Sequence, residues 1–209
     1  MDLLGRIDWT LIGSIVGNVV ISLSTAFAFF YWQLQIVVPK VRFSKQISKL
    51  PRETGGFRYR VKIENCGRRD MIDIELFARF RVKGLRPDFP GNWHGLTIPM
   101  GGRIPRLRPV RKSLMRDARE LGLKKIDFID KGPFPAKILQ SAADGSLLLE
   151  DLLSLGSKRT LQVFVFAYDA FSGSRKLFES PIYASTDIVP APFARDSVEV
   201  SVDAAQSDE

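Results

Sequence analysis

The sequence predicts a mainly β protein, in which a single N-terminal transmembrane helix is followed by a β-sandwich with one or two short helices. Residues 9–38 contain no charged side chain, and this run is long enough to cross a membrane. The segments that follow alternate apolar and charged residues, as strands with one buried face do. Stretches rich in proline and glycine separate these segments, which is typical of short strands joined by loops.

The composition is that of a globular protein with an uneven charge distribution. Apolar residues make up 45% of the chain and charged residues 26%, so disorder is not expected. Residues 1–39 have a net charge of −1, residues 40–125 of +15 and residues 126–209 of −6. The single cysteine, Cys66, and the single histidine, His94, exclude a disulfide framework and argue against a zinc site or most histidine-based catalytic arrangements.

The first element is a transmembrane helix over residues 9–38. The run exceeds the 20 or so apolar residues that span a bilayer, and aromatic residues stand near its two ends, as they do at membrane interfaces. A cleaved signal peptide is the alternative, with Ala26-Phe27-Ala28 as the cleavage site. The net charge of −1 over residues 1–8 and the continuation of the apolar run beyond Ala28 favour a retained anchor.

The charges beside the helix predict its orientation. Arg6 is the only basic residue before the span, whereas five basic residues lie within residues 40–52. Because basic loops stay in the cytoplasm, we expect residues 1–8 outside, residues 39–209 inside, and the chain in the inner (cell) membrane.

One side of the predicted helix carries small and polar residues. Gly13 and Gly17 form a GxxxG pair, and Ser14, Asn18 and Ser22 recur every four residues beside it. This stripe predicts association with a second copy or with another membrane subunit, because an asparagine amide in hydrocarbon needs a partner. Two alternatives remain: the hydroxyl groups bond their own helix backbone, or the stripe lines a water-filled pore.

Three strands are predicted next, over residues 41–47, 57–65 and 71–82. The turn Asn65-Cys66-Gly67 predicts that the second and third form a hairpin. Residues with side chains expected in the interior are Tyr59, Ile74, Leu76, Val163 and Val165.

The second half of the domain is predicted in shorter pieces. Residues 83–110 hold five prolines and five glycines and predict loops, and residues 111–121 predict a short helix. The remaining predictions are strands at 126–130 and 135–139, a helix over 146–155 capped by Ser146, strands at 160–169 and 174–184, and an acidic, flexible tail at 196–209.

The chain resembles the immunoglobulin-like cytoplasmic domain of inward-rectifier potassium channels. Near the carboxyl end, Tyr168-Asp169 precedes Phe171-Ser172-Gly173, and Tyr183, Ile188 and Phe193 follow at five-residue spacing. Near the start, Phe43-Ser44, the strand FRYRV and an Asn-x-x-Arg turn are similar to that family. The resemblance implies an immunoglobulin-like sandwich over residues 39–195.

Some features of that family are missing. The chain has no second membrane helix and no Gly-Tyr-Gly filter, and Val189-Pro190-Ala191-Pro192 replaces the family's Trp-Gly approach to Phe193. A selective potassium pore is therefore not expected from this chain alone. The resemblance implies a membrane-anchored, oligomeric β-sandwich that can bind regulatory ligands.

The densest basic segment covers residues 103–125. Its nine basic residues are Arg103, Arg106, Arg108, Arg111, Lys112, Arg116, Arg119, Lys124 and Lys125. Arginine forks suit phosphate oxygens, so the segment predicts an anion-binding patch for anionic lipid or a nucleotide. Nucleic acid is disfavoured because no recognition motif is present. The alternative is a solvated basic loop that pairs with the acidic third of the chain.

No set of residues predicts catalysis, a cofactor or a metal site. His94 has no identifiable nucleophile, and Asp169 is expected to cap its own turn. We therefore expect a non-enzymatic assembly, sensor or effector subunit. The alternatives are an oligomeric pore gated by the sandwich and a membrane-tethered binder of nucleotides or nucleic acid.

Overall fold

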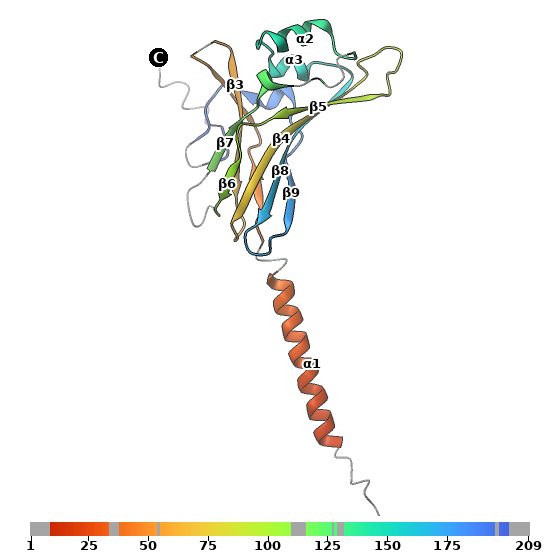
Figure 1. Ribbon diagram of the computed structural model, residues 1–209, viewed down its shortest axis with the longest axis vertical. Helices are drawn as coiled ribbons and strands as arrows, with labels where there is room; N and C mark the ends of the chain where they lie inside the picture. Colours follow the sequence, from red (N-terminus) through yellow and green to blue (C-terminus); the bar gives the residue numbers. More distant parts are fainter. Residues whose placement is uncertain are drawn as a thin grey trace, which may run out of the picture. The chain divides into compact units, whose positions relative to one another are not determined.

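The protein consists of an apolar N-terminal helix followed by two β-sheets and two short α-helices (Figure 1). The computed structural model describes residues 9–33, 38–53, 55–109, 116–126, 128, 132–194 and 197–200. The chain divides into two compact units, residues 1–38 and residues 39–209. The predicted fold class, mainly β after an N-terminal helix, is confirmed.

Helix α1 covers Trp9–Tyr31. Within it, Ile12–Tyr31 is the one helical segment in the described part of the chain that is long and apolar enough to cross a membrane, by length and composition. No acidic or basic residue lies in its first or last turn. Residues 34–37 of the predicted span lie outside the described residues.

The first sheet, sheet A, is built around β3 (Phe57–Asn65). Its strands are β1 (Val41–Phe43), β2 (Ile47–Pro51), β3, β7 (Arg116–Glu120) and β10 (Ile188–Val189). Strands β1 and β2 pair with successive parts of β3, and β7 pairs with β3 over Arg60–Glu64, all antiparallel. Strand β10 pairs with β2 in parallel.

The second sheet, sheet B, is antiparallel and is built around β4 (Met71–Lys83). Its other strands are β5 (Trp93–Pro99), β6 (Ile104–Leu107), β8 (Lys158–Asp169) and β9 (Arg175–Glu179). The order is β5-β4-β8-β9, and β6 also pairs with β4. A register shift between Ile72 and Glu75 interrupts the long β4–β8 ladder.

The two sheets share one apolar core. The five residues predicted to be interior, Tyr59, Ile74, Leu76, Val163 and Val165, are all buried and belong to one cluster. Alternation explains this result, because every second residue of β3, β4 and β8 faces the same side of its sheet. The Tyr183 hydroxyl donates a hydrogen bond to the Ser44 carbonyl at 2.7 Å inside the core, and burial raises the pKa of Tyr183 to about 12.

The predicted hairpin is wrong, because β3 and β4 belong to different sheets. The Asn65 side-chain amide donates to the carbonyl oxygens of Arg69 (2.7 Å) and Leu107 (3.2 Å), and its oxygen accepts from the Gly67 N–H at 3.0 Å. These bonds hold residues 66–70 as a corner that carries the chain from sheet A to sheet B.

Three further expectations are corrected. Residues 83–110 contain β5 and β6, which pair with β4 despite the neighbouring prolines and glycines, and His94 lies in β5. Within the expected helix at 111–121, Arg116–Glu120 is instead strand β7, which pairs with an edge of β3, and residues 111–115 lie outside the described residues. The expected strand at 135–139 is instead the start of α2 (Ala136–Ala143), where Pro135 sets the first turn and Ile138 is buried.

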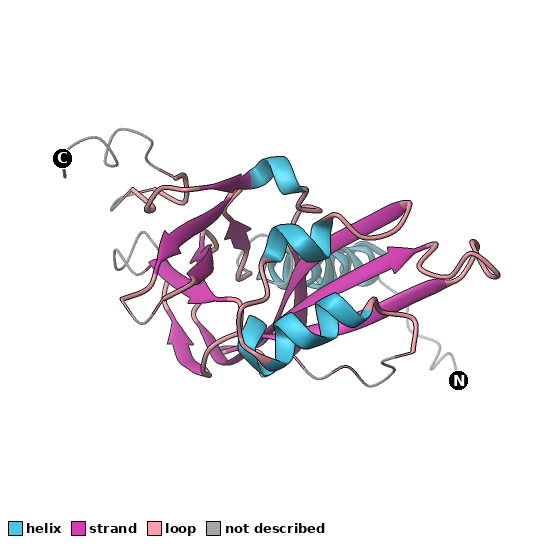
Figure 2. Cartoon of the chain, turned by 90° about the horizontal axis from the view of Figure 1, so that it is seen from above, coloured by secondary structure: helices cyan, strands magenta, loops and turns pink. Residues whose placement is uncertain are grey.

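The second short helix, α3 (Leu149–Leu153), lies in the predicted helix 146–155, although its N-cap residue is Leu148 and not Ser146. Helices α2 and α3 lie side by side across one end of the two sheets (Figures 1 and 2). A 3₁₀ turn, η2 (Leu123–Lys125), packs beside α2 and β5.

The segment after β10 packs on the outer face of sheet A. The Ser48 hydroxyl, on that face, donates to the Ala191 carbonyl at 2.6 Å, and the Lys62 ammonium donates to the Ala194 carbonyl at 2.6 Å. Within the predicted flexible tail, residues 197–200 are described, and Val198 and Val200 are buried. Residues 196 and 201–209 of that tail lie outside the described residues.

Candidate functional site

The residues of the predicted membrane stripe all lie in α1. Gly13, Ser14, Asn18 and Ser22 are exposed and Gly17 is half-buried in the single chain. A Cβ atom added at either glycine would meet no atom within 4 Å. The Thr25 hydroxyl bonds the Ile21 carbonyl of its own helix at 2.9 Å, whereas the Asn18 amide has no hydrogen-bond partner among the described residues.

The structure separates the predicted anion patch into several groups. Arg103 pairs with Glu75 at 3.0 Å, Arg106 pairs with Asp70, and Arg108 is exposed just beyond β6. Arg116 and Arg119 are in β7, and Lys124 and Lys125 are in η2. Arg111 and Lys112 lie outside the described residues. Arg103 and Arg106 are therefore engaged by acidic residues of β4 or just before it.

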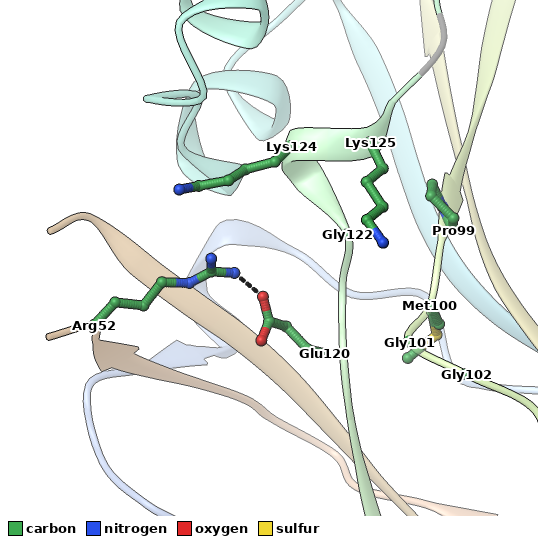
Figure 3. Close-up of a pocket in the computed structure, with 9 residues that line it drawn as sticks. All are labelled: Arg52, Pro99, Met100, Gly101, Gly102, Glu120, Gly122, Lys124 and Lys125. Atoms are coloured by element: carbon green, nitrogen blue, oxygen red, sulfur yellow. Dashed lines mark hydrogen bonds and ion pairs between the residues drawn. The ribbon is translucent and has the colours of Figure 1, made fainter. Parts of the chain in front are cut away.

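Lys124 and Lys125 line a pocket of about 370 Å³ at the seam between the two sheets (Figure 3). A single antiparallel bridge, Met100 to Leu121, joins the ends of β5 and β7 there. The pocket is lined by Arg52, Pro99, Met100, Gly101, Gly102, Glu120, Gly122, Lys124 and Lys125. In Figure 3, Lys124 extends from η2 toward the side of Arg52, and Lys125 points into the space between Glu120 and Met100.

Gly102 and Gly122 occupy positions in the pocket wall where a side chain would clash or strain the backbone. A Cβ at Gly122 would stand 2.8 Å from the Pro99 carbonyl oxygen, which accepts the Gly122 N–H at 2.7 Å. Gly102 has a φ of 70°, a backbone conformation that glycine adopts without strain. Gly101 and Gly102 therefore leave backbone uncovered at the pocket wall, where the Gly101 N–H donates to the Glu120 carbonyl at 3.1 Å and Arg119 donates to the Gly101 carbonyl at 3.0 Å.

Positive charge exceeds negative charge at the pocket. Arg52, Lys124 and Lys125 face one carboxylate, Glu120, which pairs with Arg52. Among the described residues, the ammonium groups of Lys124 and Lys125 have no ion-pair partner, and both residues are exposed. Such a group of cations suits an anion with several oxygen atoms.

Buried nitrogen atoms beside the pocket also lack acceptors. The Nε atoms of Arg52, Arg60 and Arg119 are buried and have no hydrogen-bond partner in the described part of the chain. Arg60 stands opposite Glu120 in the β3–β7 ladder, and burial, together with the charge of Arg58, lowers the pKa of its guanidinium. Because buried donors are normally satisfied, each of these three Nε atoms is a donor short of an acceptor oxygen among the described residues.

Sequence reasoning identified Lys124 and Lys125 but missed the rest of the pocket. Arg52 precedes them by more than seventy positions, and residues 99–102 belong to a stretch that was expected to be a loop. Only the pairing of β3 with β7 and of β5 with β4 brings these segments together. Gly101-Gly102 was the one visible signal, and the known phosphate-loop spacing is absent around it.

A second polar cluster beside this seam is structural. The Glu150 carboxylate of α3 accepts hydrogen bonds from the Lys49 ammonium and the Tyr59 hydroxyl, each at 2.5 Å. Burial alone would raise the pKa of Glu150, but the hydrogen bonds from Lys49 and Tyr59 outweigh it, so the pKa of Glu150 lies below its usual range. Burial and the neighbouring Glu150 carboxylate raise the pKa of Tyr59. With both oxygens engaged, Glu150 anchors α3 to sheet A.

No protein-family model matches this chain, and no curated protein matches it. The pocket is therefore interpreted from its own residues.

Proposed function

We propose that this protein is a single-pass, membrane-anchored, non-enzymatic subunit whose domain binds a phosphate-bearing anion in the pocket of Arg52, Lys124 and Lys125. In this proposal α1 is the anchor and residues 39–209 form a cytoplasmic, immunoglobulin-like domain akin to that of inward-rectifier channels. Binding there transmits a signal to an assembly in the membrane.

The observation that carries this proposal is that Lys124 and Lys125 line the pocket beside Arg52 and have no ion-pair partner among the described residues. A volume of about 370 Å³ falls within the range of small-molecule sites. Phosphate oxygens would give both ammonium groups a charged partner. The pair Arg52–Glu120 would hold the guanidinium at the rim.

The phosphate could come from a soluble anion, such as a nucleotide, or from a lipid headgroup. Both sources present the same phosphate oxygens to the pocket, so the experiment below includes a probe for each.

Titrations of the full chain in phosphatidylcholine nanodiscs test the proposal. The probes are ATP, inorganic pyrophosphate and, as the lipid arm, nanodiscs doped with phosphatidylserine. The variant Lys124→Gln/Lys125→Gln should weaken binding of the preferred probe at least about tenfold, because each bond to a charged group is worth over 1 kcal/mol. Arg106→Gln/Arg108→Gln, which removes the same charge outside the pocket, should change affinity far less.

The result identifies the ligand class as well as the site. ATP or pyrophosphate binding that the lysine variant weakens supports a soluble anion, and binding only to phosphatidylserine supports the lipid source. Equal losses in the two double variants would mean a diffuse charge effect and would overturn the pocket as the site.

Association of the anchors is the second part of the proposal. The exposed stripe of Gly13, Gly17 and Asn18 supports contact with a second copy or another membrane subunit. In a helix dimer, bare glycines permit close backbone approach, and Asn18 can reach a partner amide. An oligomeric pore lined by Ser14, Asn18 and Ser22 is the alternative; conductance in planar bilayers that Asn18→Leu abolishes would favour it.

A further inference from the structure

The outer face of sheet B changes from apolar to cationic along its two central strands. At one end, the rings of Phe77, Phe164 and Phe166 form a half-buried cluster, with centroids 5.4 Å and 5.7 Å from that of Phe77. Leu177 extends the cluster onto β9 and is 48% exposed. The outer face of a sheet sandwich normally carries polar residues, so three phenylalanines side by side are unusual there.

The other end of the same face carries basic side chains. Arg79 and Arg81 are exposed and follow Phe77 on the outer face of β4. Lys83 then stands directly opposite Lys158 of β8, and like charges in this position repel one another. Among the described residues none of these four cations has an ion-pair partner.

A hollow of about 360 Å³ lies between the two ends. It is lined by Phe77, Arg79, Arg81, Gln162, Phe164, Phe166, Leu177 and Glu179, all from β4, β8 and β9. The outer face of sheet A differs, because residues 191–194 cover part of it through the bonds of Ser48 and Lys62. In the described part of the chain, sheet B has no comparable cover.

We infer that the outer face of sheet B binds a segment of a partner protein that carries apolar side chains at one end and carboxylates at the other. The apolar side chains would pack on Phe164, Phe166 and Leu177, and the carboxylates would pair with Arg79 and Arg81. From Lys158 to Phe164 the strand runs about 20 Å, at roughly 3.3 Å per residue. A segment of roughly six to seven residues covers this length when extended.

The geometry disfavours two other occupants. Nucleobases stack on open ring faces, but Phe77 already stacks on its two neighbours and the Arg175 guanidinium lies 4.5 Å from the Phe166 centroid. A second copy of this face would bring further cations against Arg79 and Arg81, with Glu179 as the one carboxylate in the hollow. Charge complementarity therefore favours an acidic protein segment.

The test measures binding of fluorescent peptides of about eight residues, just longer than the face, to the full chain in phosphatidylcholine nanodiscs. One peptide has a leucine- and phenylalanine-rich half and a glutamate-rich half. Its controls carry lysine in place of glutamate, serine in place of the apolar residues, or the same residues in scrambled order. We expect the first peptide to bind at least about tenfold more tightly than each control.

Two variants probe the two ends of the face. Arg79→Glu/Arg81→Glu should weaken the acidic peptide about tenfold or more and strengthen the lysine peptide. Leu177→Ser should weaken both peptides, and Gln140→Glu, at an exposed position of α2 outside the hollow, serves as the control. Unchanged near-ultraviolet circular dichroism shows that each variant is folded; all four side chains face solvent.

Other outcomes overturn the inference and name the occupant. Equal binding of the four peptides removes the face as a docking surface. Tighter binding of oligo-uridine RNA that Arg79→Glu/Arg81→Glu abolishes would assign the face to single-stranded nucleic acid. Concentration-dependent self-association that Leu177→Ser abolishes would assign it to a second copy.

Discussion

Arg69 and Asp169 form a buried ion pair, with 3.2 Å between Nη1 of the guanidinium and Oδ2 of the carboxylate. Their side chains are 9% and 2% exposed. Asp169 also accepts hydrogen bonds from the Phe171 N–H at 3.1 Å and the Ser172 hydroxyl at 2.8 Å, which confirms that it caps its own turn. The Phe171 ring lies over the Arg69 guanidinium at 4.2 Å. The pair thus joins the corner after β3 to the end of β8.

This pair predicts a pH-dependent stability. Burial alone would raise the pKa of Asp169, but the hydrogen bonds from Phe171, Ser172 and Arg69 outweigh this effect. The folded-state pKa of Asp169 therefore lies below its usual value. The stabilisation is therefore complete above the unfolded-state pKa of about 4 and is lost as the pH falls through the folded-state pKa. Asp169→Asn should reduce the free energy of unfolding by about 3–5 kcal/mol near neutral pH.

Denaturant unfolding of the full chain in detergent, followed from pH 7 down to pH 3, checks this prediction. The difference between the natural chain and Asp169→Asn should shrink at the acid end, where the carboxyl becomes protonated. A difference that stays constant over this range would contradict the ion pair as its source.

The core assignment predicts a severe effect at Val165. This residue is fully buried in β8, opposite Leu76 of β4. Val165→Asp would place an unpaired charge in the core, at a cost of several kcal/mol against a typical total of about 5–15 kcal/mol. Thermal unfolding should therefore begin at a much lower temperature; Gln162→Asp, on the outer face of the same strand, is the control. Equal melting temperatures would contradict the strand orientation.

The orientation of the anchor predicts the location of the carboxyl terminus. Because the basic residues follow α1, a reporter enzyme fused after Glu209 should be active only in the cytoplasm. A periplasmic signal, or a mature chain that begins near Phe29, would show that the orientation or the retained anchor is wrong.

Packing at the glycines predicts an order of effects in α1. Gly17→Ile should weaken association of the full chain more than Asn18→Leu, because a bulky side chain separates the backbones, whereas an interhelical amide bond contributes only about 0.6–2 kcal/mol. Energy transfer between labelled chains in nanodiscs measures both variants, with Leu23→Ile, on the opposite side of the helix, as the control. The opposite order would point to a polar stripe that faces water or another protein.

Alternation of apolar and charged residues predicted β3 and β4, and a nearly continuous apolar run predicted β8. Neither pattern reveals which strands pair, so the sequence predicts a hairpin at Asn65-Cys66-Gly67, which in the structure lies in the corner between the sheets. Local composition predicts a loop at residues 93–107, where the structure has β5 and β6, and a strand at 135–139, where α2 begins. Prolines at strand ends do not prevent pairing with β4, and a short apolar run after Pro135 fits a helix as well as a strand.

The site was predictable only in part for the same reason. Charge density drew attention to Lys124 and Lys125, but it equally marked Arg103 and Arg106, which are paired with Glu75 and Asp70. Arg52 reaches the pocket through the β2–β3 pairing, and Gly101 through the bond from its N–H to the Glu120 carbonyl at 3.1 Å. These are long-range contacts, which no local pattern encodes.

Amide hydrogen exchange of the full chain in phosphatidylcholine nanodiscs, with and without pyrophosphate, tests the proposed pocket most directly. Bound phosphate should slow exchange at Gly101, Gly102 and residues 122–125 and leave residues 104–107 of β6 unchanged. The Lys124→Gln/Lys125→Gln variant should lose this protection, while Arg106→Gln/Arg108→Gln should keep it. Protection confined to residues 104–107, or protection that survives the loss of both lysines, would contradict the pocket as the anion site.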